Sequence, residues 1–302
     1  MRSKRNEGTM IESGIHRITN EEYHSDLCPE PSLSRSTIAD LINRTPAHAR
    51  YFHPRLNPGL AKEESSTFDI GTAAHSLFLE GIDNCAVIDA SDWRSKAAKE
   101  ARDEAREAGK TPLLAHQYDK VKAMVEQAHL QLAASELAIK DLHSEGDSEL
   151  SYIWQEQGVY CRVRPDWISH EKIAAGNQRK LILDLKTTGE TADPSNFGKK
   201  AISIGYDIQE AFYRRGVHAV EGGQPPLFVF MIQETYEPFL CSFVRLDPAM
   251  QEMGKQKVDM GIHLWRICMS ENNWPAYPSK VCCADTPEWA MAAWDLKADR
   301  IS

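Results

Sequence analysis

The segment KLILDLK, residues 180–186, decides the expected fold, together with CRVRPD at residues 161–166. KLILDLK is typical of a buried strand, in which successive side chains point to opposite faces of a sheet. One face then carries three leucines, and the other carries Ile182, Asp184 and Lys186. The pattern therefore predicts an acid and a base on one face at the end of a buried strand.

By the same alternation, Arg162, Arg164 and Asp166 share a face at the end of the preceding strand. Two carboxylates brought together repel each other, so such a cluster is normally supported by a cation. Mg²⁺ takes oxygen ligands and suits two carboxylates with a substrate phosphate. Lys186 would then polarise or deprotonate the attacking water and offset charge in the transition state. The alternative is a surface salt bridge between Asp184 and Lys186 beside an unrelated Pro-Asp turn.

Composition sets outer limits on the class of protein. The chain has 302 residues, 42% apolar and 26% charged, which suits one large core and excludes disorder, collagen and coiled coil as the main architecture. The longest apolar run, Leu227–Ile232, is far shorter than the roughly 20 residues of a membrane helix. Residues 1–10 hold no apolar segment typical of a signal peptide. We expect a cytoplasmic protein without a membrane partner.

Charge and cysteine content narrow the class further. A net charge of −9 argues against a uniformly basic nucleic-acid-binding surface, but it leaves a local basic groove open. The seven cysteines are scattered without a C-x-x-C pair, which indicates a reducing compartment. An iron–sulfur cluster would need Cys28, Cys268, Cys282 and Cys283, yet two adjacent cysteines can hardly both ligate one cluster.

Hydrophobic periodicity organises the rest of the chain. Residues 1–13 are polar and predict a flexible tail, and residues 14–302 predict a single domain. Helices are expected where apolar residues recur every three to four positions, and strands where they alternate. The expected helices lie at residues 34–45, 68–81, 92–110, 114–130, 206–220 and from 248 onward. The expected strands are 151–155 and 158–164, which form a hairpin, then 180–186, 227–232 and 239–246.

Two sets of apolar residues are expected to pack. A stripe in the second half of the 92–142 region indicates contact with a sheet or a neighbouring subunit, and consists of Leu114, Tyr118, Val121, Val125 and Leu130. Four tryptophans in the C-terminal part are expected to be packing anchors, namely Trp265, Trp274, Trp289 and Trp294.

Several separated blocks resemble, in one order, the RecE exonuclease domain of prophage recombination systems, within the RecB-type branch of the PD-(D/E)xK nucleases. The blocks are LSRSTIADLINRTPA (33–47), FDIGTAAHSLFLE (68–80), the strand at 149–154, CRVRPD (161–166), LDLKTT (183–188), YDIQEAFY (206–213), FVFMI (228–232) and WPAY (274–277). The resemblance implies an α/β fold with a PD-(D/E)xK restriction-endonuclease-like core, in which helices flank a central mixed β-sheet.

The resemblance also implies a metal shell. His75 would join the carboxylates of Asp166 and Asp184 as a ligand, the carbonyl of Leu185 is a further candidate ligand, and Lys186 would be the catalytic lysine. Without these neighbours, His75 would be better explained as a neutral histidine inside a helix packing layer. Imidazole becomes a good ligand when its second nitrogen is held by another group.

Further roles follow from the same resemblance. The family's Q-x-x-x-Y motif matches Gln209 and Tyr213, with Tyr206 on the same helix face. Gln209 would bond the scissile phosphate or the catalytic lysine, and Tyr213 would pack on DNA, unless the tyrosines are simply an aromatic core stripe. Glu149 would hold a second metal or the nucleophilic water, or else is a solvated acid at the start of a strand.

Terminal-phosphate binding is assigned to Ser34, Ser36 and Arg164, because hydroxyls near a helix start and a guanidinium beside metal acids suit a phosphate dianion. Ser34 and Ser36 are equally well explained as plain helix N-caps. Lys199 and Lys200 would contact the DNA backbone, or else are solvated charges.

The activity implied by the resemblance is that of a Mg²⁺-dependent exodeoxyribonuclease, with Mn²⁺ able to substitute. It would bind the ends of double-stranded DNA, digest one strand from its 5′ end and leave a 3′ overhang for a single-strand annealing protein in phage recombination. A ring-shaped homo-oligomer, a trimer or tetramer, would retain DNA by topology despite the acidic charge. The alternatives are a structure-selective or single-strand nuclease of the same superfamily and a non-catalytic protein that binds DNA ends.

Overall fold

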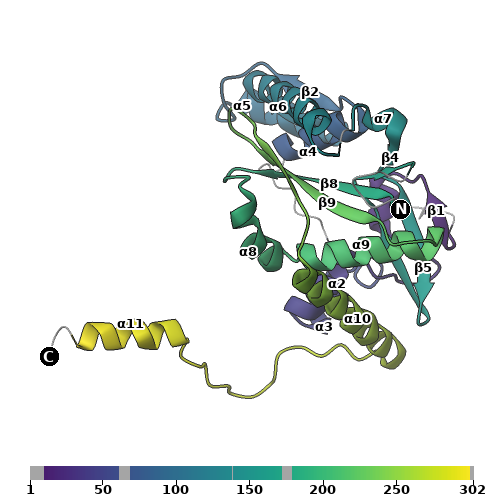
Figure 1. The fold of residues 1–302 in the computed structure, drawn as a ribbon, viewed down its shortest axis with the longest axis vertical. Helices are drawn as coiled ribbons and strands as arrows, with labels where there is room; N and C mark the ends of the chain where they lie inside the picture. The colour runs from purple at the N-terminus through teal and green to yellow at the C-terminus, as the bar shows by residue number, and fades with distance from the viewer. Residues whose placement is uncertain (1–9, 61–68, 138, 172–178, 300–302) are drawn as a thin grey trace.

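The centre of the fold is a five-stranded mixed β-sheet (Figure 1). The computed structural model describes residues 10–60, 69–137, 139–171 and 179–299, so most of the expected tail at 1–13 lies outside the described residues. Strands β8 and β9 are parallel, and the other neighbouring pairs are antiparallel. In spatial order the strands are β10 (Cys241–Val244), β9 (Leu227–Glu234), β8 (Leu181–Thr188), β7 (Trp167–Ser169) and β4 (Gly146–Ser148).

Strand β8 separates two hydrophobic cores. Its three leucines pack on one side with α4 (Asp69–His75) and α6 (Ala115–Ala134), and Ile182 packs on the other side with α9 (Tyr206–Glu221) and α10 (Pro248–Glu271). Figure 1 shows α4 and α6 above β8 and β9, with α9 below them. The alternation predicted for KLILDLK is confirmed, and both faces of the strand are covered, as expected for parallel pairing.

A second sheet holds the predicted hairpin. It consists of β1 (Gly14–His16), β5 (Ser151–Glu156) and β6 (Val159–Val163), in the order β1-β5-β6. Gln157 and Gly158 form the turn with φ of 51° and 78°, the left-handed conformation that a two-residue hairpin turn requires. Helices α2 (Arg35–Asn43) and α3 (Pro46–Phe52) pack against each other and against α10, and α1 (Asn20–Ser25) precedes them in the chain.

Short elements complete the fold. The remaining elements are the π-helical turn η2 (Ser76–Glu80), β2 (Cys85–Ile88), α5 (Lys96–Glu107), β3 (Thr111–Leu114), α7 (Leu142–Glu145), α8 (Pro194–Ile204) and α11 (Glu288–Ala298). Strands β2, β3, β4 and β7 were not expected, because three or four residues are too few to show a period. Helix α5 is polar and solvated, as its composition predicted.

The packing predicted for the apolar stripe and for the four C-terminal tryptophans was partly wrong. In α6 the buried stripe is Val121, Met124, Val125, Ala128 and Leu132, whereas Leu130 is 57% exposed. Trp265 is buried, but Trp289 and Trp294 are 74% and 64% exposed, because α11 projects from the body of the molecule (Figure 1). No helix among the described residues is both long and apolar enough to cross a bilayer.

Candidate active site

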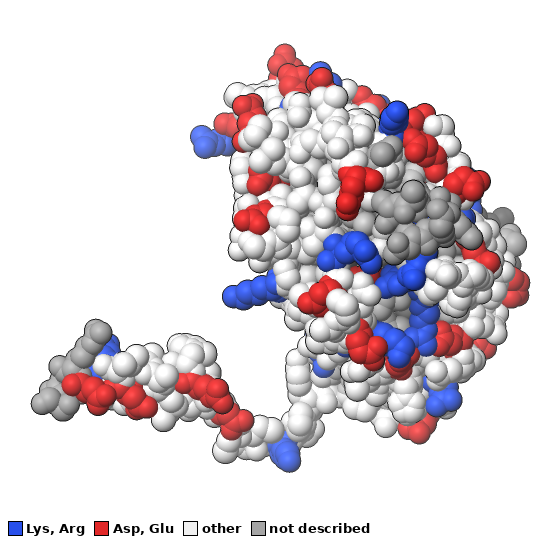
Figure 2. All heavy atoms as spheres, in the orientation of Figure 1, with Lys and Arg blue, Asp and Glu red and all other residues white. Residues whose placement is uncertain are grey.

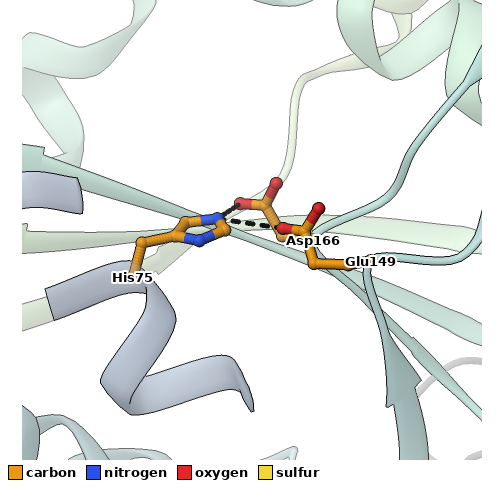
Figure 3. Close-up of side chains that lie close together, drawn as sticks. All are labelled: His75, Glu149 and Asp166. Atoms are coloured by element: carbon orange, nitrogen blue, oxygen red, sulfur yellow. Dashed lines mark ion pairs between the residues drawn. The ribbon is translucent and has the colours of Figure 1, made fainter. Parts of the chain in front are cut away.

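Three side chains from three separate elements converge beside β8 (Figure 3). His75 is the last residue of α4, Glu149 lies between β4 and β5, and Asp166 immediately precedes β7. The Nε2 atom of His75 lies 3.1 Å from Asp166 Oδ2 and 3.7 Å from Glu149 Oε1. One ligand atom of each residue falls within 4.8 Å of the others.

Backbone contacts hold the two acids together. The Glu149 amide donates to the Asp166 carbonyl at 3.2 Å, and the Leu185 amide donates to Asp166 Oδ2 at 2.9 Å. Glu149 has a φ of 57°, a left-handed conformation that costs free energy in a residue other than glycine. Arg164 lies beside it, with Nε 2.6 Å from Glu149 Oε2. The Glu149 carboxylate is therefore positioned by a constrained backbone and by a guanidinium.

Asp184 and Lys186 form an ion pair on one face of β8, as the alternation predicted. Asp184 is fully buried, and the Gln209 amide donates to its Oδ2 at 2.5 Å. Gln209 thus holds Asp184 rather than Lys186. The Lys186 Nζ lies 5.5 Å from the centre of the Tyr206 ring, where the cation faces an aromatic surface.

Crowding of the carboxylates changes their protonation. Burial, and then the Asp166 charge, raise the pKa of Glu149 and of Asp184 to about 7 each. Burial would also raise the pKa of Asp166, but His75 and Lys186 outweigh it and lower that pKa. For His75, burial lowers the pKa, whereas Asp166 and Glu149 raise it to about 9 overall. Keeping all three carboxylates ionised is therefore costly, even with His75, Arg164 and Lys186 beside them.

The donor set fits a divalent cation. An imidazole and two carboxylates, with donor atoms close together and facing one another, are ligands that Mg²⁺ or Mn²⁺ accepts. Asp184 is not one of these three residues, and it is paired with Lys186 and Gln209 instead. The predicted ligands His75 and Asp166 therefore meet with Glu149, whereas the roles predicted for Asp184 and the Leu185 carbonyl stay predictions.

The cluster opens into a cleft of about 800 Å³. Besides His75, Glu149, Arg164 and Lys186, its lining includes residues to which the sequence assigned no role, namely Arg17, Asn20, Thr72, Ser76, Glu80 and Thr187. Arg164 bridges to this wall, with Nη1 3.2 Å from Asn20 Oδ1. No motif marks Arg17 or Asn20, because only the tertiary fold brings the N-terminal segment to the cleft.

Three of the predicted DNA-binding residues, Ser34, Ser36 and Tyr213, do not line the active-site cleft. Ser34 and Ser36 line a separate cavity of about 440 Å³ with Tyr213, and Arg164 does not reach it. Ser34 also caps α2, accepting from the Thr37 amide at 3.3 Å. Ser34, Ser36 and Arg164 therefore do not share one phosphate pocket.

The sequence alternation predicted that Arg162 shares a face with Asp166, and this prediction is wrong. Strand β6 ends at Val163, so the alternation does not continue to Asp166. Arg162 is instead buried, and its Nη1 lies 3.0 Å from Asp26 Oδ1.

Fold and site together define a member of the PD-(D/E)xK nuclease superfamily. Residues 34–286 match the family described as "PDDEXK-like domain of unknown function (DUF3799)", and the chain belongs to this family. A crystal structure from Eubacterium rectale, described as a "Putative exonuclease", is similar with a TM-score of 0.57 and 15% identity, over 92% of this chain and 99% of that one. At this identity the likeness shows the fold alone. No curated protein matches the sequence.

Mn²⁺ is expected to stabilise the wild-type protein against heat, because a cation at His75, Glu149 and Asp166 relieves the repulsion. At 100 times its Kd, a ligand adds about 2.7 kcal/mol, which corresponds to a Tm increase of several degrees. The Asp166→Asn variant should lose most of this increase, whereas Asp103→Asn, an exposed acid on α5, should keep it. Differential scanning calorimetry with and without Mn²⁺ checks this, and an equal increase in Asp166→Asn would contradict the assignment.

Proposed function

We propose that the protein is a Mg²⁺-dependent exonuclease that digests one strand of linear double-stranded DNA in the 5′-to-3′ direction. It would leave a 3′ single-stranded overhang for recombination by single-strand annealing, in the cytoplasm of a cell that carries the phage or prophage. The observation that carries the proposal is the convergence of His75, Glu149 and Asp166 beside Lys186, in an open cleft of a PD-(D/E)xK fold. Mn²⁺ would substitute for Mg²⁺.

Different residues of the chain would have different roles in the hydrolysis. A divalent cation held by His75, Glu149 and Asp166 would supply Lewis-acid charge for the phosphate and the attacking water. The Lys186 ammonium, which Asp184 holds at the edge of the cleft, would neutralise negative charge as it develops on the phosphate. The attacking water would lose a proton as its oxygen bonds to phosphorus, the P–O3′ bond would break, and the leaving 3′ oxygen would take up a proton, so that one water molecule is consumed for each bond cut.

Digestion of end-labelled linear duplex DNA tests this function. With Mg²⁺, the wild type should release a 5′ label as mononucleotide and leave the complementary strand intact, and EDTA should stop the reaction. Lys186→Ala should reduce the rate at least about 10³-fold, since charge stabilisation at this position is worth about 4 kcal/mol. Lys255→Ala, which removes an exposed lysine on α10, serves as the control.

Other outcomes of the same assay identify the alternatives. Cutting of single strands or flaps, with no preference for duplex ends, would favour a structure-selective or single-strand nuclease of the same superfamily. Binding of ends without cleavage by the wild type would favour a non-catalytic end-binding protein. Release of the 3′ label first would overturn the proposed polarity.

The proposal includes a ring-shaped homo-oligomer, a trimer or tetramer, and a single-strand annealing protein as partner. Helix α11 supports an oligomer, because its large apolar side chains are exposed over most of their surface. An isolated helix of 11 residues is marginally stable in water, so packing against another surface would stabilise it. Figure 2 shows acidic side chains along one side of this helix, whereas most of its other visible surface belongs to uncharged residues.

Light scattering during gel filtration should give a mass three or four times the 34.0 kDa of one chain. Replacing Trp289 and Trp294 with alanine should shift the protein towards smaller species at micromolar concentration, because both side chains would leave the proposed interface. A control with Tyr236→Ala removes an aromatic side chain that lies outside α11 and is 43% exposed. A monomeric wild type would argue against the ring.

A further inference from the structure

A second cavity, of about 710 Å³, lies next to the active-site cleft. Lys186 and Thr187 line both spaces, so the two meet at the end of β8. A DNA strand whose phosphodiester bond lies against Lys186 must continue beyond that bond. The second cavity is placed to receive the adjoining nucleotide of that strand.

One side of α8 forms a polar wall of this cavity. The wall consists of Asn196, Lys199, Lys200 and Ser203. Their spacing of three and four residues places them on one face of the helix. All four side chains are exposed or half-buried, whereas Ala201 on the opposite side is buried in the core.

The wall on α8 carries two lysines, and two acids, Glu190 and Asp193, also line the cavity. Lys200 Nζ lies 3.1 Å from Thr188 Oγ1 and 3.3 Å from Glu190 Oε2, an acid that is 79% exposed. The other acid, Asp193, caps α8 by accepting from the Ser195 amide at 2.8 Å. Among the described residues no ion pair to Lys199 is found, and its side chain is exposed. Two ammonium groups beside a hydroxyl and an amide are the usual contacts of a DNA phosphate.

The floor of the cavity is apolar. Phe197, Tyr206 and Ile232 line it, and the rings of Phe197 and Tyr206 lie 5.7 Å apart. A paired duplex keeps its base faces stacked inside and presents sugar and phosphate to a protein. An unpaired nucleotide offers a base face together with its phosphate, which is how aromatic and cationic surfaces bind single strands. A cationic wall above an apolar floor therefore suits an unpaired nucleotide better than intact duplex.

We propose that this cavity binds one unpaired nucleotide of the DNA strand next to the bond that is cut, with the phosphate on Lys199 and Lys200 and the base against the floor at Tyr206. The inference rests on the proposed function, and it assigns a separated single strand, rather than intact duplex, as the substrate of the cleft. Terminal base pairs must then open before the strand enters, so any end that is already unpaired binds more tightly.

The test measures binding in Ca²⁺ by fluorescence anisotropy, with two duplexes that differ only in having paired or mismatched terminal base pairs. The wild type should bind the mismatched end about fivefold more tightly. Lys199→Ala/Lys200→Ala should bind that end about tenfold more weakly and lose the preference, and its slope of log affinity against log salt should shrink by about 0.7, the value for one lost single-strand phosphate contact. A Lys96→Ala/Lys255→Ala control, which removes two exposed lysines outside the cavity, should behave as wild type.

Two results would overturn the inference: a wild type with no preference for the mismatched end, or a double variant that keeps the wild-type preference and salt slope. An unchanged Tm of the double variant shows that its fold is intact. Mg²⁺-dependent cleavage by the wild type is measured on the same duplexes. Absent cleavage with the preference intact would disprove the nuclease and leave the cavity assignment standing, whereas cleavage without the preference would disprove the cavity assignment alone.

Discussion

Repulsion among three carboxylates, those of Glu149, Asp166 and Asp184, is the constraint on which the site depends. Burial and mutual proximity raise the pKa of Glu149 and Asp184, because keeping these carboxylates ionised side by side costs free energy. The Lys186 ammonium offsets part of this cost by pairing with the Asp184 carboxylate. At Glu149 and Asp166, beside His75, a divalent cation would stabilise the ionised carboxylates. Binding of a cation and folding of this part of the chain are therefore coupled.

The fold resists this repulsion by fixing each acid on a rigid element. Strand β8 is packed on both faces, so Asp184 cannot move away without disturbing two cores. Asp166 is held by the Leu185 amide of the same strand, and Glu149 by Arg164 and a left-handed backbone. Strain and supporting hydrogen bonds of this kind hold a site in its working geometry before substrate binds.

The sequence predicted the central part of this arrangement but not its surroundings. Strand alternation correctly predicted the two faces of β8, with Asp184 and Lys186 on one of them, and the β5–β6 hairpin, because each strand has enough residues for a period of two. It placed Asp166 on the same strand as Arg162, an error that arose because β6 ends at Val163, three residues before Asp166. His75 and Glu149 were proposed from resemblance, since nothing local in the sequence brings either residue to Asp166. Hydrophobicity alone also could not distinguish buried Trp265 from exposed Trp294.

Lys and Arg side chains gather across the middle of one face of this acidic chain, as the proposed binding of DNA would require (Figure 2). The central claim is that His75, Glu149 and Asp166 hold the cation beside Lys186. Anomalous diffraction from crystals soaked in Mn²⁺ tests it most directly. The account predicts a Mn²⁺ peak bounded by these three side chains in the wild type and none in Asp166→Asn. A wild-type protein that cleaves DNA with Mn²⁺ but shows its anomalous peak elsewhere, or shows none in the cleft, would contradict the account.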